Sequence, residues 1–230
     1  MIARTALIAG VATALAAATA HAQDGSGGVV APAPAPATPA ETASGGGVQL
    51  SVLPSGTAGQ PVLVHGTAPL RAAGHQVKLQ LQNPATLRWK KVTGARVAQD
   101  GTFTERWKPA KAGQYALRGV LHGASAPLAV TVYQSALATW YGPGMWGNQT
   151  ACGETLTPDL EGVAHKSLPC GTPVTLSYEG RTITVPVIDR GPYGVPGAQY
   201  DLTQAAAFTL GMLETETIGA LPQPVAAASR

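Results

Sequence analysis

Residues 181–193, RTITVPVIDRGPY, decide the expected architecture, because an alternating strand stops there at a Gly-Pro turn. Residues 181–188 alternate in polarity as a half-buried β-strand does, and the strand places Asp189 at its end. Turn formers are frequent throughout, with 28 Gly and 19 Pro among 230 residues, whereas charged residues make up only 12%. This composition favours short strands joined by many turns over a helical bundle or a coiled coil.

The residues that follow this turn predict one short helix. Asp201 and Gln204 fit a capping box, with Asp201 as the N-cap. The helix is then expected over Ala205–Leu210 and should end at Gly211.

The first 47 residues are predicted to precede the folded part. Residues 1–22 fit a secretory signal peptide, with Arg4 ahead of an apolar run and Ala20-His21-Ala22 as the cleavage site. The run is too short for a transmembrane anchor, so none is expected. Residues 23–47 are rich in Ala, Pro and Gly and are predicted to be a disordered linker.

Residues 48–133 are predicted to form an immunoglobulin-like β-sandwich, because about seven alternating segments recur there at regular spacing. The predicted strands are Val48–Leu53, Pro61–Thr67, Gln76–Gln82, Arg88–Val97, Gly101–Trp107, Gln114–Leu121 and Leu128–Tyr133.

Charge divides the chain into two parts. Residues 48–133 hold ten Lys/Arg and two Asp/Glu, a net charge of +8, whereas residues 134–230 hold four and eight, a net charge of −4. The basic part either binds an anionic surface or simply carries a solvated basic face. Nucleic acid is not an expected partner of an exported protein.

The only two cysteines, Cys152 and Cys170, are predicted to form a disulfide, as an even cysteine count in an exported protein suggests. Two thiols without paired histidines are only half a zinc site, so a metal site is the weaker alternative. No cofactor is expected.

Four motifs occur in order in the last part of the chain: Thr139-Trp140-Tyr141-Gly142-Pro143-Gly144 with Gly153-Glu154, then Val163 to Thr172, then Val187 to Tyr193, then Tyr200 to Thr203. This series resembles the rare lipoprotein A family, over roughly residues 135–212. The resemblance implies a six-stranded double-psi β-barrel, related to expansins, over residues 134–220, with residues 221–230 as a disordered tail. The whole chain is thus expected to be all-β.

The same resemblance implies a lytic transglycosylase, a lyase that cleaves peptidoglycan glycan strands and leaves 1,6-anhydro-muramic acid ends. The family's functional residues correspond to Glu154, His165 and Asp189. We expect Asp189 to be the acid and base, because burial at a strand end raises the pKa of a carboxyl group. His165 orients it or binds sugar, and Glu154 stabilises charge at the anomeric carbon. Each residue also has a structural alternative. Asp189 would cap a turn, His165 would be a core histidine, and Glu154 would be a solvated carboxylate on a loop.

Four further residues are expected to bind substrate: Trp140, Tyr141, Arg190 and Asp201. Trp140 fits a core position equally well. For Arg190 a clamp on a loop, and for Asp201 the helix N-cap, are the favoured structural alternatives. The expected partner is peptidoglycan, with anionic wall polymers as partners of the basic sandwich, in the cell wall or periplasm. The alternative function is a non-catalytic, expansin-like module that binds or loosens wall polysaccharide.

Overall fold

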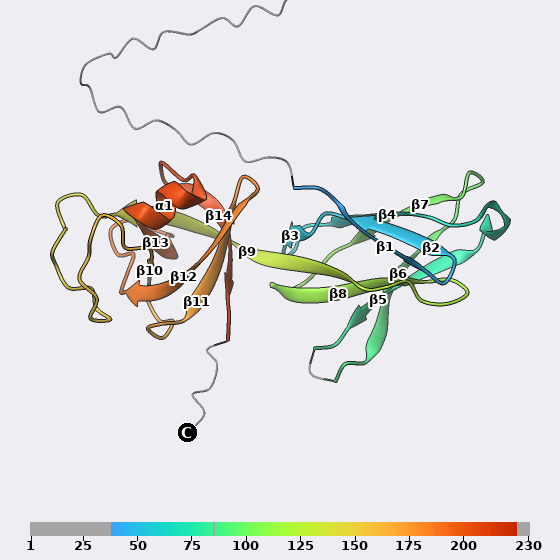
Figure 1. The fold of residues 1–230 in the computed structure, drawn as a ribbon, viewed down its shortest axis with the longest axis horizontal. Coiled ribbons are helices and arrows are strands. Elements are labelled where there is room, and N and C mark those ends of the chain that lie inside the picture. The colour runs from blue at the N-terminus through green and yellow to red at the C-terminus, as the bar shows by residue number, and fades with distance from the viewer. Residues whose placement is uncertain (1–37, 85, 225–230) are drawn as a thin grey trace, which may run out of the picture. The chain divides into compact units, whose positions relative to one another are not determined.

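The structure, a computed structural model, describes residues 38–84 and 86–224. These residues form strands, a short helix and a single 3-10 turn (Figure 1), which confirms the expected all-β class. The predicted signal peptide, most of the predicted linker and the last six residues of the predicted tail lie outside the described residues. Within the described part of the chain, no helix is long and apolar enough to span a membrane.

The strands are β1 (Glu41–Gly45), β2 (Val48–Val52), β3 (Ser55–Thr57), β4 (Val62–Thr67), β5 (Gln76–Gln82), β6 (Trp89–Arg96), β7 (Thr102–Trp107), β8 (Gly113–Val120), β9 (Leu128–Tyr141), β10 (Val163–His165), β11 (Pro173–Tyr178), β12 (Arg181–Asp189), β13 (Tyr200–Thr203) and β14 (Glu216–Pro222). The 3-10 turn η1 covers Leu70–Ala72, and the helix α1 covers Gln204–Leu210.

The N-terminal strands form two sheets around one hydrophobic core. Strands β1, β2, β4 and β7 form a four-stranded sheet in that order. The first half of β9 pairs with β8 in a second sheet, in which β5 and then β6 follow. Strand β3 pairs with β9 in parallel. Both sheets contribute to the core, through side chains that include Leu50, Val64, Val77, Leu79, Phe103, Trp107, Leu117 and Val130. Whether this sandwich has the immunoglobulin topology stays a prediction.

Strand β1 corrects the predicted linker. Residues 41–45 were expected to be disordered, but they pair antiparallel with residues 48–52 of β2. Gly46 and Gly47 join the two strands with φ values of 56° and 79°, in the left-handed region that two-residue hairpin turns require. Backbone hydrogen bonds make this strand, and none of its side chains is fully buried, so its composition resembles that of a linker.

The second half of β9 begins a barrel that β10–β14 complete. Strand β9 pairs with β14 antiparallel and with β13 in parallel, while β10 lies between β12 and β13. Strand β11 joins β12 to β14. The inward residues form a separate core, including Ala138, Val163, Leu176, Val185, Val187, Leu202 and Ile218, on which Ala206, Leu210 and Met212 pack. The last strand extends to Pro222, so the barrel includes the start of the predicted tail.

The helix confirms one predicted end and corrects the other. Its N-cap is Thr203, whose hydroxyl accepts a hydrogen bond from the Ala206 N–H at 3.3 Å, and not Asp201. Asp201 lies two residues earlier, within β13. Gly211 ends the helix with a φ of 88°, as expected.

Candidate functional site

Strand register places two carboxylates on one face of the barrel. In the β12–β10–β13–β9 part of the sheet, Ala164 pairs with both Asp189 and Asp201, and Asp201 pairs with Thr139. Paired residues on neighbouring strands project to the same face, and each strand step is about 4.8 Å. The chain positions of Asp189 and Asp201 are therefore about 9.5 Å apart, with only the methyl group of Ala164 between them.

Asp189 lies at the end of β12, next to an irregularity in the sheet. The β10–β12 register shifts between Val163 and Ala164, so Ile188 is an extra residue just before Asp189. Such bulges re-aim the following side chain. Asp189 Oδ1 accepts hydrogen bonds from the N–H of Ala151 at 2.9 Å and of Arg190 at 2.8 Å. These two backbone donors fix the position of this carboxylate oxygen.

Asp201 has a different environment. Thr139 donates its hydroxyl proton to Asp201 Oδ1 at 2.6 Å. Burial raises the pKa of Asp201, the Thr139 hydrogen bond opposes that rise, and the negative charge of Asp189 adds to it. Burial thus disfavours the ionised form of Asp201 relative to a solvent-exposed carboxyl group.

Tyr141 places a hydroxyl group among the carboxylates. It lies two residues after Thr139 on β9 and so shares its face. Burial raises its pKa, followed by the charges of Asp189, Asp201 and Glu154. The hydroxyl oxygen is buried and lies close enough to the Asp189 carboxylate for their interaction to raise the pKa of Tyr141, although no described residue meets full hydrogen-bond geometry with it. The protonated phenol is therefore a hydrogen-bond donor beside this carboxylate.

Glu154 lies on the loop whose Ala151 N–H donates to Asp189. The Thr150 hydroxyl donates to Glu154 Oε2 at 3.0 Å and accepts from the Glu154 N–H at 3.2 Å. The same loop supplies the Ala151 donor to Asp189, and Cys152 N–H donates to the Ile188 carbonyl at 3.1 Å. Glu154 is exposed, and its charge contributes to the raised pKa of Tyr141. Glu154 therefore lies at the edge of the site that contains Asp189 and Asp201.

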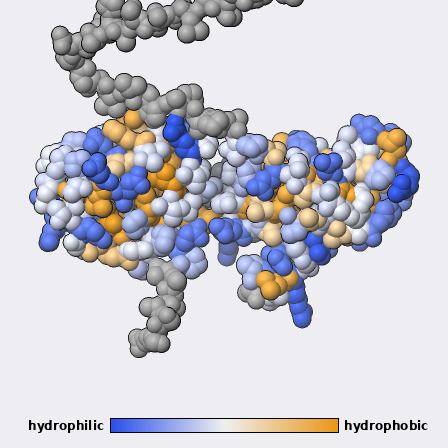
Figure 2. Space-filling view, in the orientation of Figure 1, coloured by the Kyte–Doolittle hydropathy of each residue, from blue (hydrophilic) through white to orange (hydrophobic). Residues whose placement is uncertain are grey.

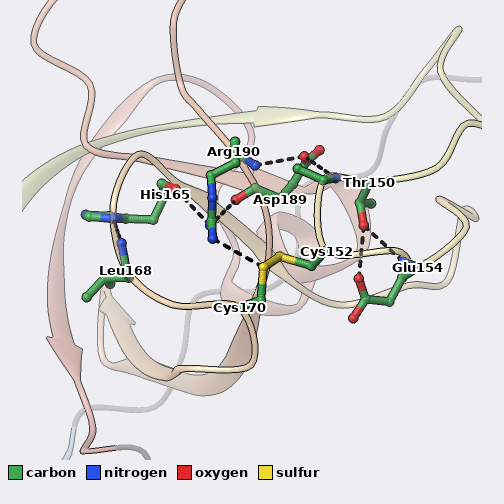
Figure 3. Close-up of a disulfide and its surroundings, with 9 residues drawn as sticks. Thr150, Cys152, Glu154, His165, Leu168, Cys170, Asp189 and Arg190 are labelled. Atoms are coloured by element: carbon green, nitrogen blue, oxygen red, sulfur yellow. Dashed lines mark hydrogen bonds between the residues drawn. A yellow bond between two sulfur atoms is a disulfide. The ribbon is translucent and has the colours of Figure 1, made fainter.

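The predicted disulfide is present and anchors this loop. Cys152 and Cys170 are bonded, with 5.7 Å between their Cα atoms. Figure 3 shows the disulfide beside Arg190, between the loop of Glu154 and the segment that follows His165. The bond thereby ties the Glu154 loop to the chain that leads into β11.

His165 does not contact Asp189. Its Nδ1 accepts hydrogen bonds from the N–H groups of Ser167 at 3.1 Å and Leu168 at 2.9 Å, so the neutral ring carries its proton on Nε2. Burial lowers its pKa, with further lowering by Arg190 and Lys166. The ring lies 5.0 Å from that of Tyr200, a core residue, and points away from Asp189 in Figure 3. His165 thus closes a turn on the face opposite the carboxylates.

Arg190 and Trp140 are engaged within the protein. The guanidinium of Arg190 donates to the carbonyls of His165 and Asp189, both at 3.3 Å, and to Cys170 Sγ at 3.2 Å. Trp140 donates its Nε1–H to the Leu213 carbonyl at 2.9 Å and packs on Phe208. These contacts match the structural alternatives for both residues.

Sequence reasoning did not single out Thr139 or Tyr193. Thr139 opens the first motif, but its contact with Asp201 arises from the parallel β9–β13 pairing, which no local pattern reveals. Tyr193 follows Asp189 by four residues, and its side chain is 75% exposed. An aromatic ring in a Gly-Pro loop beside a carboxylate was the signal that could have identified it. Among residues 38–84 and 86–224, no cluster of three His, Cys, Asp or Glu side chains is arranged to hold a metal ion.

Known proteins have segments similar to the barrel of this chain. Residues 133–221 match the family model described as lytic transglycolase. Similar proteins include the endolytic peptidoglycan transglycosylase RlpA of Campylobacter jejuni, 40% identical over 95 residues, which are 40% of this chain and 34% of that protein. The probable endolytic peptidoglycan transglycosylase RlpA of Aquifex aeolicus is 40% identical over 88 residues, 37% of this chain and 38% of that protein.

A third relative, the endolytic peptidoglycan transglycosylase RlpA of Yersinia pestis, is 43% identical over 81 residues, 34% of this chain and 22% of that protein. The chain therefore spans between about a fifth and two fifths of the length of these relatives. The match coincides with the barrel and its row of carboxylates. Residues 133–221 therefore form a domain of the rare lipoprotein A-like double-psi β-barrel family.

Proposed function

We propose that the chain is a peptidoglycan lytic transglycosylase that cleaves glycan strands and leaves 1,6-anhydro-muramic acid ends. The observation that carries the proposal is the pair Asp189 and Asp201 on one face, two strand steps apart and in different environments. Glycosidic cleavage needs one carboxyl group that gives a proton and one group that takes a proton. The similarity of the barrel to proteins named endolytic peptidoglycan transglycosylases supports the same reaction.

In this proposal Asp201 is the acid, which differs from the expected choice of Asp189. The raised pKa of Asp201 keeps more of it protonated, so it can donate a proton to the bridging glycosidic oxygen as the C–O bond breaks. The muramic C6 hydroxyl then bonds to its own C1. Asp189, whose carboxylate oxygen is positioned by two backbone N–H groups, accepts the hydroxyl proton, so the reaction consumes no water.

The remaining residues surround that reaction. Tyr141 places its hydroxyl group beside Asp189, where it can hydrogen-bond that carboxylate, and Tyr193 offers an exposed ring on which a sugar can stack. Glu154 stabilises positive charge at the anomeric carbon. His165 and Arg190 act as positioning residues, because their polar groups hold the loops on either side of Asp189.

The test is to incubate the purified chain with peptidoglycan and to analyse the soluble products by mass spectrometry. Release of anhydro-muropeptides supports the proposal. Binding to peptidoglycan without any product would instead support the alternative, a non-catalytic expansin-like module. A hydrolase would release reducing ends that carry one more water, which the same spectra distinguish.

The cellular setting belongs to the same proposal. We propose export to the periplasm or cell wall, through a signal peptide over residues 1–22. Sequencing the N-terminus of the mature protein tests this, since cleavage after Ala22 leaves Gln23 first. The basic sandwich is proposed to hold the chain on an anionic wall polymer.

A further inference from the structure

The sheet of β8, β5 and β6 has an outer face that carries cations and amides. Val77 and Leu79 of β5 point into the core, so Lys78 and Gln80 point outward. The register then places Lys91 of β6, Gln80 of β5 and Arg118 of β8 in one row across the three strands. None of these three strands contains an acidic residue.

The aromatic ring of Trp89 lies beside this row. The Arg118 guanidinium lies 4.0 Å from the centre of the Trp89 ring, and its Nε donates to Gln80 Oε1 at 2.9 Å. The interaction between a cation and an aromatic face restrains both groups relative to one another. A half-buried Trp, a planar guanidinium and an amide form a platform of the kind that sugar rings contact.

A basic hollow adjoins this platform, where the edge strands β6 and β7 approach one another. It has a volume of about 460 Å³ and is lined by Lys90, Lys91, Val92, Thr93, Arg106, Trp107 and Lys108. Four of these seven residues are cationic and none is acidic. Lys91 lines the hollow and also belongs to the row with Gln80 and Arg118, so the two features are continuous.

The cations of this surface are not neutralised within the described part of the chain, where none of them forms an ion pair with a carboxylate. Like charges held close together repel one another, and a bound polyanion relieves that repulsion. The row from Arg118 to Lys91, which lines the hollow, spans two strand steps, about 9.5 Å. This length exceeds what a single anionic group needs. On the face that Figure 2 shows, hydrophilic residues lie beside hydrophobic ones on the hairpin of β5 and β6.

We propose that this surface, the row Lys91–Gln80–Arg118 with Trp89 and the adjoining hollow, binds an acidic polysaccharide. The cations contact the carboxylates of successive sugars, and Trp89, Arg118 and Gln80 contact the sugar rings and hydroxyls. The inference locates the wall contact named under the proposed function and gives its chemistry. It does not depend on cleavage by the barrel.

The test is a binding titration of the full chain with polygalacturonate, with neutral dextran as the uncharged comparison. The informative variant is Lys91→Gln/Arg106→Gln/Lys108→Gln. Its matched control is Arg71→Gln/Arg88→Gln/Lys111→Gln, which removes three cations from outside the row and the hollow. We expect tight, salt-sensitive binding by the wild type, at least about a tenfold loss in the first variant and less than about a threefold loss in the control.

A second variant tests the sugar contact. Trp89→Phe keeps an aromatic ring and every charge, and we expect it to weaken binding of polygalacturonate more than binding of polyphosphate, which has no sugar rings. Equal losses in the two triple variants, or no selective effect at Trp89, would overturn the inference. Asp201→Asn should bind polygalacturonate as the wild type does, and the triple variants should still cleave, so the two proposals fail separately.

Discussion

Replacing Thr139 by Val tests the role assigned to Asp201. Valine keeps the shape of threonine but removes the hydroxyl that donates to Asp201 Oδ1 at 2.6 Å. That bond stabilises the ionised carboxylate and lowers its pKa, so its loss raises the pKa of Asp201 further. If Asp201 is the acid, cleavage is lost on the alkaline side as Asp201 ionises, and Thr139→Val shifts that limb to higher pH.

The size of the shift follows from the hydrogen bond. A bond to a charged group contributes about 1.5–3 kcal/mol, of which only a part distinguishes the ionised from the neutral acid. Taking about 1.4 kcal/mol for that part, the alkaline limb moves up by about one pH unit. This shift is measured from the rate of anhydro-muropeptide release between pH 4 and about pH 9.

Thr182→Val, at an exposed threonine of β12, is the matched control and should leave the profile in place. Both variants must show the wild-type thermal midpoint to within a few degrees. An alkaline limb that stays in place or moves down in folded Thr139→Val would refute the assignment of Asp201 as the acid.

Three further changes have definite expected outcomes. Tyr141→Phe removes a buried hydroxyl that lies beside Asp189 without full hydrogen-bond geometry, so stability in urea should change little while cleavage falls by about tenfold; unchanged cleavage would show that this hydroxyl has no part in the reaction. Cys152→Ser/Cys170→Ser should lower the free energy of unfolding by about 3 kcal/mol, and a urea midpoint equal to that of the oxidised protein would contradict this. His165→Asn supplies an oxygen that can accept the turn N–H groups, so it should retain cleavage better than His165→Ala; equal, complete loss in both would point to a catalytic imidazole.

Local pattern was sufficient for much of the fold. The alternation of Val77 and Leu79 with Lys78 predicted β5, because burial on one face imposes a period of two. Strand β1 was missed since its pairing depends on backbone hydrogen bonds, although the Gly46-Gly47 pair is a hairpin signal. The N-cap was misplaced by two residues because Asp201 and Thr203 are both good N-caps, and the pairing of β13 with β9 and β10 decides between them.

The site was less accessible to sequence reasoning. Motifs identified Asp189, Asp201 and Tyr141, but their meeting on one face depends on which strands are neighbours. The separation of His165 from Asp189 follows from parity, since Ala164 shares the carboxylate face and the next residue must face the other way. Burial of Asp201 is likewise a property of the assembled barrel and of no local segment.

Cleavage by Asp201→Asn measures the central claim most directly. The amide keeps the volume of the side chain and can still accept the Thr139 hydrogen bond, but it has no acidic proton to give to the glycosidic oxygen. We predict that the wild type releases anhydro-muropeptides from purified peptidoglycan and that Asp201→Asn releases them about 10² to 10⁴ times more slowly while binding peptidoglycan equally well. Wild-type rates of anhydro-muropeptide release by folded Asp201→Asn would contradict the account.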